Sequence, residues 1–184
     1  LTLTLTLTLT PAYGYATTVA GGYGNFAQEW SAVGGGWSNK VYGSFTSVNG
    51  GLYNTAYADY GAMGGGSSNR IHSDYASVAG GDSNVNDGYG GAIGGGLSNT
   101  VESSNSSVIA GGSHNALQGN WSSIGGGTLN TIHGMGAVIA GGQSNNVAAQ
   151  VAAIGGGVDN FVDGQGGVIG GGSQNIASMW STVG

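Results

Sequence analysis

A short phrase that recurs about every 15 residues constrains this chain more than any other feature of its sequence. The phrase consists of an aliphatic residue, two or three glycines, two variable residues and an asparagine, as in VGGGWSN at 33–39 and IGGGTLN at 124–130. A fixed short period over almost the whole chain predicts a stacked repeat architecture. The eleven asparagines are Asn25, Asn39, Asn54, Asn69, Asn84, Asn99, Asn115, Asn130, Asn145, Asn160 and Asn175, spaced by 14, four times 15, once 16 and four times 15.

When the repeats are aligned on the asparagine, two apolar columns become visible. One lies six positions before it and runs from Val19 and Val33 to Ile154 and Ile169; the other lies two positions after it, with Asn86 as its polar exception. Glycines in every repeat make helices implausible, because each Gly in a helix interior costs about 1 kcal/mol relative to Ala. Two short strands and two turns per repeat therefore predict an all-β fold, a parallel, left-handed β-roll or β-solenoid of about eleven 15-residue coils.

The composition separates this chain from disordered and collagen-like sequences. It has 42 glycines in 184 residues, but also nine Tyr, four Trp and three Phe, and only one proline. Disordered chains are usually poor in aromatic residues and rich in charge, and collagen needs glycine at every third position. The composition therefore indicates an ordered repeat protein. The absence of cysteine excludes disulfides, thiolate metal sites and thiol nucleophiles.

The charge balance excludes some classes of partner. The formal net charge is −6, and Lys40 and Arg70 are the only basic residues apart from three histidines. Nucleic acids and anionic membranes are therefore not expected as partners. No stretch of the chain approaches the roughly 18 apolar residues that a membrane helix needs, so no membrane insertion is expected within this chain.

The chain divides into two segments, a Leu/Thr-alternating strand at 1–12 and glycine-rich repeats at 13–184. Alternation of LTLTLTLTLT places leucines on one face and threonines on the other, which favours an extended strand. This strand could cover the first coil, or it could insert into a neighbouring subunit and join subunits head to tail. So simple a sequence is also compatible with a stand-in for an unidentified segment.

Each column of the repeat has a physical interpretation. Stacked asparagines can form an amide ladder along the axis, and glycines allow positive φ and close approach of backbones. The position before the last two glycines alternates for much of the chain between Gly and a residue with a side chain, as in Gly64, Ala79 and Gly94, which suggests a two-coil unit. Because the apolar content per coil is small, the burial of a second face in a homo-oligomer is expected.

The repeats resemble the head domains of trimeric autotransporter adhesins, the YadA-like family. Those heads carry repeats of the form S-x-V-G-G-G-x-x-N-x-A-x-G, and SSIGGGTLNTIHG (122–134) and TSVNGGLYNTAYA (46–58) match this form closely. The resemblance covers residues 13–184. It implies a trimeric, left-handed parallel β-roll that binds host matrix or other cells.

No enzyme active site, cofactor or metal centre is expected. His72 and His133 share a column but lie four coils apart, about 19 Å at the strand spacing, and His114 lies in another column. The glycine triplets lack the Lys-Ser/Thr of a phosphate loop. Among the scattered acids only Asp59 and Asp74 share a column on adjacent coils, where a weak Ca²⁺ site is a minor alternative. Serines are interpreted as small strand and turn residues.

An aromatic column is the feature most open to function. It lies nine positions before the asparagine or in the equivalent place, and its members are Trp30, Phe45, Tyr60, Tyr75, Trp121 and Trp180. We expect it to line a contact between chains, because large rings bury much area; alternatively, it is an exposed stripe that binds protein or glycan.

The sequence therefore predicts a non-enzymatic adhesin head at the extracellular cell surface that mediates attachment to cells or matrix. Its partners would be copies of itself, as a homotrimer, and a protein or glycan of the host or of a neighbouring cell. The alternative is the structural subunit of an extracellular filament or fibre, polymerised head to tail through the N-terminal Leu/Thr strand. The behaviour of the two ends would discriminate between these hypotheses.

Overall fold

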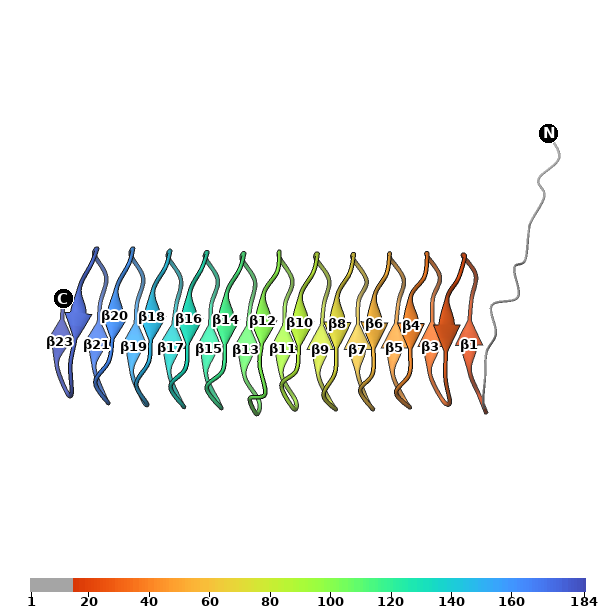
Figure 1. The fold of residues 1–184 in the computed structure, drawn as a ribbon, viewed down its shortest axis with the longest axis horizontal. Helices are drawn as coiled ribbons and strands as arrows, with labels where there is room; N and C mark the ends of the chain where they lie inside the picture. The colour runs from red at the N-terminus through yellow and green to blue at the C-terminus, as the bar shows by residue number, and fades with distance from the viewer. Residues whose placement is uncertain (1–14) are drawn as a thin grey trace, which may run out of the picture.

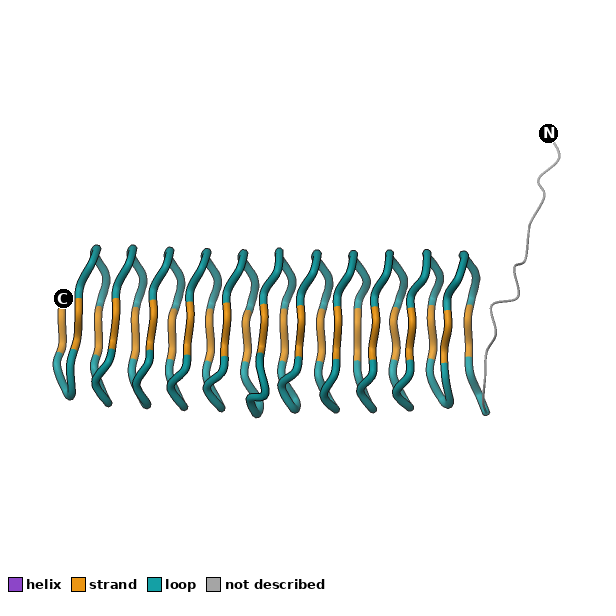
Figure 2. Tube along the Cα trace, viewed as in Figure 1, coloured by secondary structure: helices purple, strands orange, loops and turns teal. Residues whose placement is uncertain are grey.

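The computed structural model describes residues 15–184, which form a parallel β-solenoid of about eleven coils (Figure 1). The described residues contain strands and turns but no helix, and every strand has two residues (Figure 2). The all-β parallel solenoid predicted from the repeat is thereby confirmed. The predicted Leu/Thr strand at 1–12 lies outside the described residues.

Two sheets form the walls of the solenoid, and each coil adds one strand to each sheet. The twelve-stranded sheet contains the odd-numbered strands: β1 Thr18–Val19, β3 Ala32–Val33, β5 Ser47–Val48, β7 Ala62–Met63, β9 Ser77–Val78, β11 Ala92–Ile93, β13 Val108–Ile109, β15 Ser123–Ile124, β17 Val138–Ile139, β19 Ala153–Ile154, β21 Val168–Ile169 and β23 Thr182–Val183. The eleven-stranded sheet contains the even-numbered strands: β2 Phe26–Ala27, β4 Lys40–Val41, β6 Thr55–Ala56, β8 Arg70–Ile71, β10 Val85–Asn86, β12 Thr100–Val101, β14 Ala116–Leu117, β16 Thr131–Ile132, β18 Asn146–Val147, β20 Phe161–Val162 and β22 Ile176–Ala177.

The register keeps the columns of the sequence aligned through the whole solenoid. Val33 pairs with Val48 and Ile154 with Ile169, so the residue six positions before the asparagine always meets its counterpart. The extra residue of the 16-residue repeat lies between β12 and β13, because Asn86 pairs with Val101, 15 residues on, whereas Ala92 pairs with Val108, 16 residues on. It is accommodated in a turn, where the green loop at the lower edge of Figure 1 is irregular.

The core is a thin double column of side chains between the two sheets. In most strands the second residue is buried and the first points outwards, as in Ser123–Ile124 and Thr131–Ile132. A buried aliphatic side chain of this size contributes about 1.5–3 kcal/mol. Asn86 replaces the aliphatic residue in one coil and is also fully buried; its Nδ2 donates to the Ser77 carbonyl and its Oδ1 accepts the Gly88 N–H.

The alternation of glycine in the repeat has a steric cause. A Cβ on Gly64 would lie 2.1 Å from the Ala79 carbonyl oxygen of the next coil, and one on Gly94 would lie 2.2 Å from the Ala110 oxygen. Real Cβ atoms essentially never come that close to backbone. Over 20–155 these glycines alternate with alanine, or with Asn49 in one coil, and Gly170 after Gly155 breaks the pattern. Close packing between coils gives the two-coil unit suggested by the sequence a physical basis over that range.

Candidate functional site

Each coil has two turns of different character. The first, which we call the glycine turn, joins the twelve-stranded sheet to the eleven-stranded sheet through the Gly-Gly-x-x-Asn phrase. The second, which we call the aromatic turn, leads back from the eleven-stranded sheet and contains the predicted aromatic column. The glycine turns form the upper edge of the solenoid in Figure 1 and the aromatic turns form the lower edge, from which the chain enters β1.

A continuous asparagine ladder runs along the glycine turns. Asn84 illustrates it: its backbone N–H donates to Oδ1 of Asn69 at 3.0 Å, and its own Oδ1 accepts the N–H of Asn99 at 3.0 Å. Its Nδ2 donates to the carbonyl of Gly80 in its own coil and to that of Gly96 in the next coil. The same backbone link joins all consecutive members from Asn25 to Asn175. The ladder is buried along almost its whole length and therefore has a structural role.

The glycine before the two variable residues is required by this ladder. Gly127 has φ +89°, and a Cβ there would lie 2.1 Å from the Gly142 carbonyl oxygen and 2.6 Å from Nδ2 of Asn130. Equivalent contacts recur from Gly22 to Gly157. The inner part of the glycine turn is thus filled by its own backbone and by that of the next coil.

The aromatic turns carry a stack of exposed rings, which we call the aromatic ridge and define as Trp30, Phe45, Tyr60 and Tyr75. Their ring centroids are 6.0, 5.1 and 4.9 Å apart, and the ring planes are within 14° of parallel. Each side chain is 50–53% exposed. The sequence-predicted column thus forms a stack at the surface of the single chain.

Backbone conformation shows that this turn does not require aromatic residues. The four residues of the ridge have φ between 55° and 59°, in the left-handed region. This conformation costs an ordinary residue about 1–2 kcal/mol and suits glycine. Gly136 and Gly166 occupy the equivalent place in later coils with φ of 66° and 68°. Strain of this kind at an exposed position motivates a functional hypothesis for the side chain.

Two predicted members of the column do not join the ridge. Trp121 lies on a later coil between Ser106 and Gly136, and Trp180 lies near the C-terminal end, where its ring covers Gly166. A Cβ on Gly166 would lie 2.4 Å from the Trp180 ring. The structure therefore brings together four of the six predicted residues and leaves the other two as separate rings.

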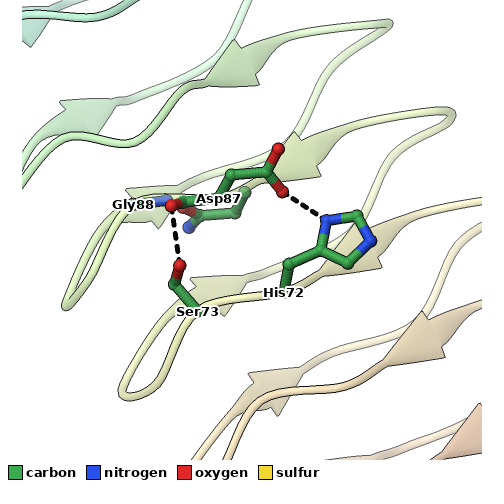
Figure 3. Close-up of polar contacts among 5 residues, drawn as sticks. His72, Ser73, Asp87 and Gly88 are labelled. Atoms are coloured by element: carbon green, nitrogen blue, oxygen red, sulfur yellow. Dashed lines mark hydrogen bonds and ion pairs between the residues drawn. The ribbon is translucent and has the colours of Figure 1, made fainter.

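A second stack lies beside the ridge and was missed in the sequence. Tyr42, Tyr57 and His72 stack with centroids 5.0 and 5.2 Å apart. These residues lie three positions after successive asparagines, so their spacing of 15 residues was the available signal. His72 Nδ1 contacts the Asp87 carboxylate within hydrogen-bond distance, and the neighbouring Ser73 donates its hydroxyl to the Asp87 carbonyl at 2.7 Å (Figure 3).

The carboxylates next to the ridge accept hydrogen bonds from backbone N–H groups. Asp59 Oδ1 accepts the Ser44 N–H at 2.7 Å, and Asp74 Oδ1 accepts the Asp59 N–H at 2.9 Å. Partial removal from solvent is the main cause that raises the pKa of Tyr75 above its ordinary value of 10.0, and Tyr89, Tyr60, Asp74 and Asp59 raise it further. Within residues 15–184, no group of three or more His, Asp and Glu side chains could hold a metal ion.

Two buried serines, Ser107 and Ser122, form hydrogen bonds with the backbone of the next coil, whereas the buried hydroxyl of Ser104 has no hydrogen-bond partner within residues 15–184. Ser122 Oγ donates to the Gly134 carbonyl at 2.9 Å and accepts the Ala137 N–H at 3.0 Å. Ser107 Oγ likewise donates to the Gly119 carbonyl. Both hydroxyls fill a corner of the coil, as the interpretation of serines as small strand and turn residues implies.

The outer faces of the two sheets differ in chemistry. The twelve-stranded sheet presents uncharged side chains or glycines, such as Ala62, Gly64, Ser77 and the exposed Val108, and it has a shallow depression of about 510 Å³ between β5 and β13. The outer face of the eleven-stranded sheet carries both basic residues of the chain, Lys40 and Arg70, with acids and aromatic rings. A face so free of charge over its whole length is suited to contact with another surface.

Comparison with models of known protein families and with curated protein sequences gave no match. Among residues 15–184 there is also no helix of the length and apolar character that crossing a membrane requires.

Proposed function

We propose that this chain is the head of a non-enzymatic adhesin that acts at the extracellular cell surface and attaches to cells or matrix. The observation that carries the proposal is the exposed aromatic ridge, in which four successive coils place rings at a backbone position that suits glycine. Exposed aromatic side chains are common anchors in protein contacts. The resemblance of the repeats to YadA-like heads supports the same function.

The proposed assembly is a homotrimer of left-handed rolls, in which the outer face of the twelve-stranded sheet packs against the other copies. The uncharged side chains of this face support close packing, and a thin core gains stability from burial of a second surface. In this arrangement the aromatic ridge faces outwards. We therefore prefer the face of the twelve-stranded sheet as the contact between chains, in place of the aromatic column expected from the sequence.

Light scattering combined with negative-stain imaging tests the assembly. Discrete trimers are expected, and Ala62→Glu should shift them towards monomers, whereas His133→Glu on the exposed outer face of the other sheet should not. A monomeric parent protein at micromolar concentration would overturn the trimer. Long uniform fibres would instead favour the filament subunit.

Attachment tests the function. Beads coated with the protein should adhere to cells or to surfaces of matrix protein, and replacement of Phe45 and Tyr60 by alanine should weaken adhesion. Tyr53→Ala, at an exposed ring of a glycine turn, is the matched control. Equal adhesion by protein-coated and uncoated beads would contradict the proposed function.

A further inference from the structure

Trp121 occupies the aromatic column at a place where the next ring is missing. Its N–H donates to the Asn105 carbonyl at 2.9 Å, and the Gly136 N–H donates to the Asn120 carbonyl at 2.9 Å. Tyr60 and Tyr75 make the same hydrogen bonds to the Ser44 and Asp59 carbonyls in the ridge. Trp121 and Gly136 therefore hold the same relative positions as Tyr60 and Tyr75, but without the second ring.

The space above Gly136 is open. A Cβ placed on this glycine would meet only Cγ2 of Val151, at 4.0 Å, and nothing closer. By contrast, the corresponding space at Gly166 is filled by the ring of Trp180, 2.4 Å from such a Cβ. Trp121 is 62% exposed. The coil spacing that stacks Tyr60 and Tyr75 at 4.9 Å thus leaves a ring-sized slot beside the indole of Trp121.

Hydrogen-bonding side chains lie on the coils next to this slot, and the orientation of the Asn120 amide is fixed. Asn120 Oδ1 accepts the Asn105 N–H at 2.7 Å, which identifies Nδ2 as the donor that remains for a ligand. The indole Nε1–H of Trp121 is a second donor. Gln150 is exposed two coils along the same edge from Asn120. An apolar ring face next to amide donors is the combination that binds a ring with one C–H face and hydroxyl groups at its rim.

The geometry points to a binding slot for a neutral hexopyranose residue of a glycan, formed by Trp121, Gly136 and Asn120. The C–H bonds on one face of a pyranose carry partial positive charge and meet the negative face of the indole, while its hydroxyls accept hydrogen bonds from Asn120 and the indole. The sugar is neutral because Lys40 and Arg70, the only Lys or Arg residues of the chain, lie on β4 and β8, several coils away. The assignment of a glycan as the ligand rests on the proposed adhesin function. In an oligomer, several copies of the slot would strengthen binding beyond that of a single site.

Titration with simple glycosides tests the slot directly. In ¹H–¹⁵N spectra of the full chain, the indole signal of Trp121, assigned through Trp121→Phe, should shift on addition of methyl β-D-galactopyranoside, methyl β-D-glucopyranoside or methyl α-D-mannopyranoside. Signals of Trp30, Trp37 and Trp180 should stay in place. Sialyllactose, which is anionic, should not bind more tightly than these neutral glycosides. No shift of the Trp121 signal with any of the three would overturn the proposal.

A variant that fills the slot provides the sharper test. Gly136→Tyr should complete a two-ring stack with Trp121, because tyrosines occupy the same backbone position at φ of 57° and 59° in the ridge. It should retain the fold by circular dichroism and weaken glycoside binding at least about tenfold, about 1.4 kcal/mol. Tyr53→Ala, at an exposed ring of a glycine turn outside the ridge, is the control that should leave binding unchanged. Unchanged binding by folded Gly136→Tyr would contradict the slot.

The slot and the proposed function can fail separately. If the coated beads adhere but no glycoside shifts the Trp121 signal, the sugar inference is wrong and the adhesin proposal stands. If adhesion to a matrix protein without glycans depends on Trp121 and is lost in Gly136→Tyr, the slot binds a protein side chain and the glycan assignment is overturned. Glycoside binding without adhesion would retain the slot and contradict the adhesin.

Discussion

The two turns of each coil differ in how closely they pack against the neighbouring coils. The glycine turn has the same backbone in all eleven repeats, with two glycines and an asparagine whose side chain bonds its own coil and its neighbours. The aromatic turn varies in length, contains rings in some coils and glycine in others, and leaves its side chains exposed. A turn packed by the adjacent coil tolerates little change, whereas a turn that faces solvent can carry recognition.

Aromatic content also divides the solenoid along its length. Twelve aromatic residues, including Trp37 and Tyr53 of the glycine turns, lie at 15–89, and only Trp121, Phe161 and Trp180 follow. Rings therefore stack in the N-terminal coils, but Trp121 stands apart. The same fold thus offers a continuous ridge at one end and an isolated ring with an open neighbour further along.

The largest effect is expected from a side chain in the packed part of a glycine turn. Gly127→Ala should destabilise the protein by about 3 kcal/mol or more, because the Cβ meets backbone at 2.1 Å and φ is +89°. Gly141→Ala, where a Cβ meets nothing within 4 Å, is the matched control and should change little. Urea unfolding followed by circular dichroism measures both; equal stability of the two variants would contradict the steric argument.

The second largest loss of stability is expected from a substitution in the asparagine ladder. Asn84→Ala should cost about 2–3 kcal/mol, because it leaves the Asn99 N–H and the Gly80 carbonyl without this partner and removes one of the two hydrogen bonds to the Gly96 carbonyl. Asn49→Ala is the control: it removes an exposed amide at a position that Ala79 occupies in another coil, so the free energy of unfolding should hardly change. The comparison uses thermal and urea unfolding. Similar losses in both variants would show that the ladder contributes no specific stability.

Removal of one ring from the aromatic ridge should have a smaller effect. Tyr60→Ala loses stacking with Phe45 and Tyr75, which is expected to cost about 0.5–1.5 kcal/mol. Tyr53→Ala, at an exposed tyrosine that stacks on no other ring within residues 15–184, should cost less. Differential scanning calorimetry checks the order, and a loss at Tyr60 as large as that at Asn84 would remove the distinction between the two turns.

The smallest effect is a pH dependence at Tyr75. Its pKa is raised above 10.0 in the folded protein, so the folded state holds the phenol proton more tightly than the unfolded state. The associated stability is present below pH 10.0 and is lost as the pH rises through the folded pKa. Tyr75→Phe should therefore lose less stability in alkaline solution than the parent. Urea unfolding at neutral and alkaline pH tests the direction, and a steeper alkaline loss in the variant would contradict it.

Much of the fold could be predicted because the repeat exposes its columns directly. The register of Val33 with Val48, the place of the extra residue after Val101 and the buried position of Asn86 all follow from alignment on the asparagine. The candidate site was less accessible. Alignment located the column of Trp30 and Trp121, but could not show which rings stack, because stacking depends on the neighbouring coil and on side-chain direction.

The sequence by itself determined the solenoid, the two turns of each coil and the requirement for glycine at fixed positions of the phrase. Periodicity carries this information, because every coil must meet the next in register. Only the tertiary structure decided that the twelve-stranded sheet presents an uncharged face, that Tyr42 and Tyr57 form a second stack, and that Gly136 leaves the slot beside Trp121 open. These features depend on distances between side chains of different coils, which a one-dimensional period does not contain.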